Sequence, residues 1–309
     1  MADIAAPNEF ALTGDRRNSL RKLMQRKSTV AFLMALPLIV LIATLVIYPT
    51  GYAIWLSMLN KSMTKFVGFG TFEFLLKRQT FWDIVYQSCL FAITAVIFKA
   101  MIGFVVAHFV HNIPAKGQRK WRGMLLVPWV IPPAMSTLAW LWLLDPSYSA
   151  INWILVHLGM SNISWLGETG WARFSVILVN IWAGSPFFMI MYLAALKSVP
   201  DQLYEAASID GATWLQRIWY VTLPMMRNII AVTALFSLIV TFANFDIVRV
   251  LTAGGPLTST QLFATWAFKV GIESGDIPQG AAVSLFMVPI LAVAAAFILR
   301  DINKRGSEV

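Results

Sequence analysis

Charged residues are scarce in this 309-residue sequence. They make up 13% of the chain, against about 25% in an average soluble domain. Hydrophobic residues make up 58%, so there is too little polar side-chain surface to cover a water-soluble body of this size. The composition excludes an ordinary soluble globular protein and predicts that much of the chain is buried in lipid.

Cysteine and the common catalytic motifs are also missing or nearly so. Cys89 is the one cysteine of the sequence, and a single cysteine supports neither an internal disulfide nor a cysteine-based metal site. The sequence has no Gly-x-x-x-x-Gly-Lys-Ser/Thr loop, no dinucleotide-binding glycine fingerprint, no nucleophile elbow and no cluster of metal ligands. We therefore predict a chain that is not an enzyme, holds no cofactor or metal and does not hydrolyse ATP itself.

Long apolar segments are abundant instead. A helix needs about 20 apolar residues to cross the hydrocarbon core of a bilayer. Six segments reach this length: 30–58, 84–111, 122–145, 173–197, 227–251 and 276–300. Strands of a membrane barrel would be about half as long and would alternate polar with apolar residues. The pattern therefore predicts an all-α integral membrane protein with six transmembrane helices.

The lysines and arginines between these segments indicate the orientation. If the N-terminus lies in the cytoplasm, 16 of them fall on the cytoplasmic side and 6 on the outer side, as the positive-inside rule requires. The net charge of +9 is then a sign of membrane topology, not of nucleic-acid binding. We expect both termini in the cytoplasm and the following parts: a basic tail at 1–29, an uncleaved first span at 30–58, an outer loop at 59–83, a five-helix core at 84–299 and a tail at 300–309.

Prolines fall inside several predicted spans, among them Pro128, Pro132, Pro133 and Pro186. A proline removes a backbone donor and bends or breaks a helix. In a membrane this is tolerated where other helices or water satisfy the freed carbonyls. Two interpretations remain open: simple kinks, or a solute pathway lined by broken helices.

The loop at 198–224, SVPDQLYEAASIDGATWLQRIWYVTLP, has the signals of a helical hairpin. Ser198 followed by Asp201 is similar to a capping box at a helix start. Gly211 can take the left-handed turn that ends a helix. We expect a first short helix before Gly211 and a second one that Pro224 stops.

This loop resembles the EAA loop of binding-protein-dependent ABC importer permeases. The pattern of that family is Glu-Ala-Ala, three residues, Gly, nine residues and Ile-x-Leu-Pro. The residues that the resemblance marks for contact with an ATPase are Glu205, Ala206, Ala207, Asp210, Gly211, Leu223 and Pro224. Val221 stands where isoleucine is usual. Small alanines would let the helix enter a groove of the ATPase, and Glu205 would meet a basic group there.

The resemblance implies more about fold and partners. Stretches 125–155 and 242–260 are similar to the sugar-specific branch of the family. The implied protein is a type I permease subunit of an ATP-driven carbohydrate importer in a bacterial inner membrane, with its first span wrapped around a partner permease. The implied partners are a second, different permease, two ATPase subunits that bind ATP and Mg²⁺, and an extracytoplasmic sugar-binding protein.

Polar residues inside the spans are the candidates for contact with the solute, because such residues are costly in lipid. They are Lys99, Asn180, Trp182, Ser185, Asn244 and Asp246. Each also has a structural interpretation. The asparagines can bond neighbouring helices, and Asp246 can pair with Arg249 three residues further along a helix.

Two other functions stay open at this point. One is an ABC permease for a non-sugar solute. The other is an ion-coupled secondary transporter, which would be expected to have paired repeats and more intramembrane carboxylates than Asp246.

Overall fold

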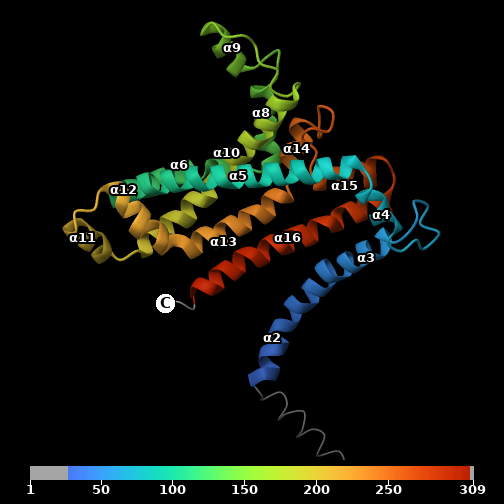
Figure 1. The fold of residues 1–309 in the computed structure, drawn as a ribbon, viewed down its shortest axis with the longest axis horizontal. Helices are drawn as coiled ribbons and strands as arrows, with labels where there is room; N and C mark the ends of the chain where they lie inside the picture. The colour runs from blue at the N-terminus through green and yellow to red at the C-terminus, as the bar shows by residue number, and fades with distance from the viewer. Residues whose placement is uncertain (1–26, 307–309) are drawn as a thin grey trace, which may run out of the picture. The chain divides into compact units, whose positions relative to one another are not determined.

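The computed structural model describes residues 27–306, and the predicted basic tail lies outside them except for its last three residues. Helices joined by short connections make up this part of the chain (Figure 1). No strand occurs in it beyond an isolated bridge between Leu59 and Phe66. The all-α prediction is confirmed. The chain divides into two compact units, Met1–Trp55 and Leu56–Val309, which are described separately.

The first unit contains most of one long helix. It begins as α2 (Lys27–Ile42), passes through the π turn η1 (Ala43–Ile47) and continues as α3 (Tyr48–Ser57), which reaches into the second unit. The span Val30–Ser57 has a mean hydropathy of 2.9 over its most apolar window. A helix of this length and composition crosses a bilayer.

The second unit holds the remaining helices. In chain order they are α4 (Gly70–Leu76), α5 (Gln79–Asn112), α6 (Ala115–Leu125), α7 (Val127–Val130), α8 (Pro133–Leu143), α9 (Ala150–His157), α10 (Thr169–Ser198), α11 (Asp201–Ile209), α12 (Trp214–Arg217), η2 (Ile218–Thr222), α13 (Leu223–Phe242), α14 (Asp246–Leu251), α15 (Phe263–Phe268), η3 (Lys269–Glu273) and α16 (Ile277–Gly306). Helices α5 and α10 pack along each other, and α13 packs against both and against α16 (Figure 1).

Five helices of the described residues are long and apolar enough to cross a membrane: Val30–Ser57, Gln79–Asn112, Thr169–Ser198, Trp214–Leu251 and Ile277–Arg300. The third predicted span is not one helix, because it is broken between α7 and α8. Ile131 is extended, at φ −67° and ψ 132°, since a residue before proline is excluded from the helical region. Pro132 is extended before Pro133 for the same reason. The chain then runs along α8, away from the direction of α5 (Figure 1).

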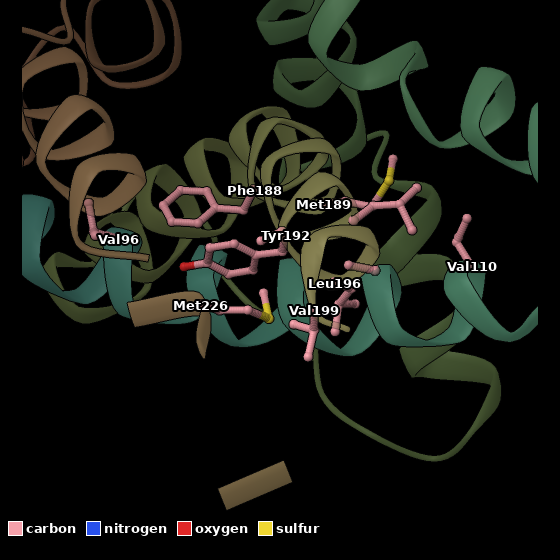
Figure 2. Packing of buried hydrophobic residues seen from close by; sticks show 11 residues of the cluster. Val96, Val110, Phe188, Met189, Tyr192, Leu196, Val199 and Met226 are labelled. Atoms are coloured by element: carbon pink, nitrogen blue, oxygen red, sulfur yellow. The ribbon is translucent and has the colours of Figure 1, made fainter. Parts of the chain in front are cut away.

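Helix α10 is the centre of the second unit. Half of its most apolar window, 50%, is buried, more than in any other described span. Phe188 and Tyr192 are fully covered and pack edge to face, with ring centroids 5.6 Å apart, against Met226 of α13 (Figure 2). Gly103 of α5 has no room for a Cβ, because the added atom would collide with Phe188 Cβ and would lie 3.1 Å from the backbone nitrogen of Met189. Such close backbone contact is how helices associate in lipid, where the hydrophobic effect does not drive them together.

The start of α13 differs from the prediction. Pro224 does not stop the second helix of the loop; the chain stays helical from Trp214 through η2 into α13. In η2 the N–H of Leu223 bonds to the carbonyl of Ile218, five residues back. This wide turn accommodates a proline at the second position of α13, since the extra residue relieves the clash with the preceding turn. The second loop helix is therefore the beginning of the fifth span.

Candidate functional site

Two regions of the second unit carry most of the candidate residues: an exposed arm and a polar cavity. The surface arm, residues 199–222, leaves the end of α10 and returns at the start of α13. Val199 is extended because it precedes Pro200, and α11 begins at Asp201, whose charge suits a helix N-terminus. The predicted capping box at Ser198 is wrong, because this hydroxyl donates to the carbonyl of Ala195.

The helix α11 ends as the sequence predicts. Gly211 has φ +76°, a conformation that costs an L-residue about 1–2 kcal/mol. Its N–H bonds to the carbonyl of Ser208, and the N–H of Ala212 bonds to that of Ala207. This pair of bonds is a Schellman motif. A capping box of Thr213 with Gln216 then starts α12, so the turn between the two helices has a defined angle.

Three side-chain bonds hold the arm in place. The hydroxyls of Tyr204 and Thr222 are 3.0 Å apart and link α11 to η2. Arg217 Nη1 donates to Ser208 Oγ at 3.1 Å. The indole of Trp214 donates to His108 Nε2 of α5 at 3.2 Å. Helices α11 and α12 are thus fastened to each other and to the long helix α5, so that the arm moves with the core.

Most side chains of the arm are exposed. No residue of α11 is buried. Most of the residues that the resemblance marks for contact with an ATPase are exposed: Glu205, Ala206, Asp210, Gly211 and Pro224. The other two, Ala207 and Leu223, are half-buried. Large apolar side chains are exposed beside them, with Ile209 at 87% and Tyr220 at 79%. Exposed apolar groups of this density mark a surface that meets lipid or another protein.

The polar cavity has a volume of about 190 Å³ and lies between α5, α7, α8, α10, α13 and the start of α14. The break in the third predicted span forms part of its wall through Pro128, Ile131 and Pro133. Irregular backbone at membrane depth is tolerated where it lines a cavity or is buried in protein. Of the two interpretations of the prolines, the structure agrees with the broken helix for α7 and α8.

Lys99 is the charged residue of this cavity. It is 3% exposed, and its ammonium donates to Thr241 Oγ1 at 2.7 Å and to Ser237 Oγ at 3.4 Å. Its stem passes over Gly184 of α10, where a Cβ would lie 2.6 Å from Lys99 Cδ. Among the described ion pairs, none includes Lys99. Lys99 therefore joins α5 to α13 across α10 without a counter-charge.

Asn180 and Asn244 also line the polar cavity. The side-chain oxygen of each is buried and has no hydrogen-bond partner within the described structure. Burying an amide oxygen without a donor is costly, so each oxygen is a ready acceptor for a hydroxyl group. The structural interpretation, a bond to a neighbouring helix, does not apply to either oxygen.

The other candidates lie elsewhere. Trp182 and Ser185 line a separate, largely apolar cavity of about 420 Å³ with residues of α5, α6 and α7. The hydroxyl of Ser185 donates to the carbonyl of Ile181. Asp246 is exposed, and its expected pairing with Arg249 is wrong, because Arg249 pairs with Glu273 at 2.6 Å.

Three residues that contact Lys99 in the polar cavity were missed from the sequence. Ser237 and Thr241 accept the bonds of Lys99, and Gly184 makes room for its stem. A signal was present, because Ser237, Thr241 and Asn244 are spaced by four and three residues and so share one helix face. This spacing does not predict the contact with Lys99, because Lys99 is remote in sequence.

Known proteins match this chain over most of its length. Residues 99–305 match the family described as binding-protein-dependent transport system inner membrane component. The trehalose/maltose transport system permease protein MalF of Thermococcus litoralis is 32% identical over 273 residues, 87% of this chain and 92% of that protein. The sulfoquinovosyl glycerol transport system permease protein SmoG of Agrobacterium fabrum is 30% identical over 281 residues, 89% and 91%.

A solved structure has the same fold. A chain of a bacterial ABC transporter involved in the import of the acidic polysaccharide alginate superposes with a TM-score of 0.78 at 24% identity, covering 91% of this chain and 99% of that one. At this identity the likeness establishes the architecture alone. It confirms the all-α importer-permease fold that the loop resemblance implies.

Proposed function

Because the chain belongs to the family of inner membrane components of binding-protein-dependent transport systems, we propose that it is the permease subunit of an ATP-driven carbohydrate importer. The family comprises the membrane components of these systems, so the chain is a multi-pass, non-catalytic transport subunit. ATP and Mg²⁺ belong to partner ATPase subunits.

The surface arm is the observation that carries this proposal. An arm that moved freely would transmit no force, whereas this arm is bonded to α5 and continuous with α10 and α13. Its outer side presents Glu205 and Ala206 without partners in the chain's own core. We infer that the ATPase takes α11 into a groove and that closure of the two ATPases moves α10 and α13 with it.

Carbohydrate as the solute is supported by the relatives and by the polar cavity. The named relatives transport trehalose and maltose or sulfoquinovosyl glycerol. Sugars need hydrogen-bonding groups and apolar ring faces, and the cavity offers Lys99, Asn180 and Asn244 together with Trp129 and Phe187. These five side chains are the proposed contacts on this subunit.

The size of the polar cavity supports a second permease. Ligand sites usually enclose about 300–1,000 Å³, and the cavity of this chain encloses about 190 Å³. One subunit then supplies half of the pathway, and the other half comes from a different permease. The first span, with its apolar surface in every direction, suits packing against that partner.

The proposed orientation places both termini and the surface arm in the cytoplasm. It rests on the lysine and arginine distribution in the loops. The loop before α9 and the short helix α9 then lie on the outer side, where a sugar-binding protein docks. Solute released there enters the pathway when the ATPases close, and ATP hydrolysis resets the inward-facing state.

Purification from the native membrane tests the proposed function. We expect the ATPase subunits, a second permease and a sugar-binding protein to co-purify with the tagged chain. The ligand of the binding protein then identifies the sugar. Glu205→Lys is expected to lose the ATPase, while Gln202→Lys, on an exposed neighbour, keeps it. Recovery of a binding protein specific for an amino acid, phosphate or polyamine would replace the sugar by that solute.

An ion-coupled transporter would behave differently in the same preparation. It would purify without an ATPase, and its solute uptake into vesicles would stop when the ion gradient is removed. Uptake that depends on ATP and persists without the gradient excludes this alternative.

A further inference from the structure

A second polar cavity, the histidine cavity, lies where the surface arm meets the core. It has a volume of about 360 Å³. Helix α5 supplies His108 and His111 at its C-terminal end, and the surface arm supplies Tyr204, Trp214 and Arg217. Neither the solute pathway nor the outer face of α11 uses these side chains.

Three nitrogens of these residues lack partners. They are Nδ1 of His108, Nδ1 of His111 and Nε of Arg217, all buried and without a hydrogen bond in the described structure. A buried donor left without an acceptor costs about 1–3 kcal/mol. The three nitrogens belong to residues that line one cavity, and those that carry a proton call for a ligand that accepts hydrogen bonds.

The hydrogen bond that His108 makes determines whether its unpartnered Nδ1 is a donor or an acceptor. Its Nε2 accepts the indole N–H of Trp214 at 3.2 Å, so this nitrogen carries no proton. The proton of the neutral ring is then on Nδ1, which becomes a donor. Arg217 Nε is a donor at any pH of interest, and its Nη1 already donates to Ser208. At least two unpartnered donors thus belong to residues that line one cavity.

The charge of the histidine cavity has one sign. Arg217 is a permanent cation, and neither aspartate nor glutamate is among the lining residues. Arginine and histidine together bind oxyanions of phosphate type through charge-assisted hydrogen bonds. A cation would be repelled, and a neutral solute would leave the charge uncompensated.

We propose that the histidine cavity binds a phosphate group through Arg217, His108 and His111. The bound group joins the end of α5 to α12 and so fixes the base of the surface arm. The phosphate belongs either to a free phosphate or phosphate ester or to the headgroup of a phospholipid. A cavity at the end of a membrane-spanning helix is within reach of both, and the experiment distinguishes them.

The chain offers a direct spectroscopic test, because it has only three histidines. The third, His157, lies in α9 and contacts Trp153, so it serves as the internal control. The full-length protein, labelled with ¹⁵N-histidine, is frozen in a phosphorus-free detergent. Solid-state NMR then measures which ¹⁵N signals are attenuated by dipolar coupling to ³¹P, first with added inorganic phosphate and then with added phosphatidylglycerol.

We expect attenuation of the His108 and His111 signals and none of His157. Attenuation in the phosphate sample only assigns a free phosphate, and attenuation in the lipid sample only assigns a headgroup. No attenuation in either sample, or equal attenuation of all three histidines, overturns the proposal.

Variants test the same site by affinity. Arg217→Gln is expected to raise the phosphate or lipid concentration for half-maximal attenuation at least about tenfold, while Arg119→Gln, on an exposed residue of α6, leaves it unchanged. His111→Gln provides a second variant without a side-chain bond to lose, and it is expected to weaken the attenuation of the His108 signal. Equal affinity in Arg217→Gln and Arg119→Gln contradicts the proposal, as does an unchanged His108 signal in His111→Gln. The binding readout needs no ATPase, so it stands or fails separately from the importer function.

Discussion

The surface arm exposes apolar side chains, whereas the polar cavity encloses hydrogen-bonding ones. Ile209 and Tyr220 are exposed on the arm, while Lys99, Asn180 and Asn244 line one small cavity inside the core. Each region reverses the usual placement of its residue types. The reversal agrees with the proposed function, in which an ATPase covers the arm and a polar solute enters the cavity.

The two regions also differ in how they are held. Local turns and two side-chain bonds within the arm shape it, and one distant bond, from Trp214 to His108, ties it to α5. The cavity depends on contacts between helices that are far apart in sequence, above all the bond of Lys99 to Thr241. Substitutions in the arm should therefore affect coupling and leave the fold intact, and substitutions in the cavity should affect both.

The largest effect is expected from Gly184→Val in the cavity wall. The new side chain would occupy the path of the Lys99 stem and push the ammonium from Thr241. We expect uptake into vesicles to be lost and thermal stability to fall, since overpacking typically costs about 1–3 kcal/mol. Gly123→Val, where no atom lies within 4 Å of an added Cβ, is the control. Equal uptake and melting temperature for the two variants would show that the cavity wall is not packed as described.

Gly211→Ala is expected to give the next largest effect. Its neighbourhood is as open as that of Gly123, but its φ of +76° puts strain on any side chain, by about 1–2 kcal/mol. The turn between α11 and α12 should deform to relieve this strain, and uptake should fall about tenfold, while membrane insertion stays normal and the melting temperature falls less than in Gly184→Val. Gly123→Ala keeps full uptake. A Gly211→Ala protein with full uptake would mean that the angle of the arm does not matter for transport.

Asn180→Ala and Asn244→Ala are expected to have an intermediate effect. Each removes an unpartnered oxygen, so the fold loses no hydrogen bond from it. A solute loses one hydrogen bond worth about 1 kcal/mol, which corresponds to a roughly fivefold fall in uptake. Asn228→Ala, on an exposed residue, is the matched control. Unchanged uptake in both cavity variants would remove them as contacts for the solute.

The smallest effect is expected from Tyr204→Phe in the arm. It removes the hydrogen bond between α11 and Thr222, worth about 0.5–1.5 kcal/mol, and keeps the ring. Hydrogen exchange of the α11 amides should quicken, while the amides of α5 stay as protected as before. Protection lost equally in both helices would contradict the division between a locally held arm and a core held by distant contacts.

The sequence predicts what local chemistry decides. Gly211 as the end of α11 follows from its place behind a helical stretch, and the confirmed all-α membrane fold follows from the length of the apolar segments. The arm is presented on the surface by a segment of 27 residues, 198–224, that matches a known pattern. All of these features depend on residues close together in the chain.

The features that the sequence does not predict depend on distant contacts and on the direction in which each residue projects from its helix. Pro224 continues a helix only because the π turn before it absorbs the misfit, and the sequence alone does not distinguish this from a helix end. Asn180 and Gly184 share a face of α10, while Trp182 lies about 200° around the helix from Asn180 and meets a different cavity. Arg249 pairs with Glu273, 24 residues away, instead of with Asp246.

Cross-linking from the surface arm tests whether α11 meets the ATPase. In a Cys89→Ser background, which removes the one natural cysteine, Ala206→Cys places a thiol on the exposed side of α11, and Tyr148→Cys places one on a residue that is 89% exposed before α9. A thiol-to-amine cross-linker applied to the native membrane is predicted to join residue 206 to the ATPase subunit, and residue 148 to no ATPase. No ATPase product from residue 206, or equal products from both positions, would contradict the account.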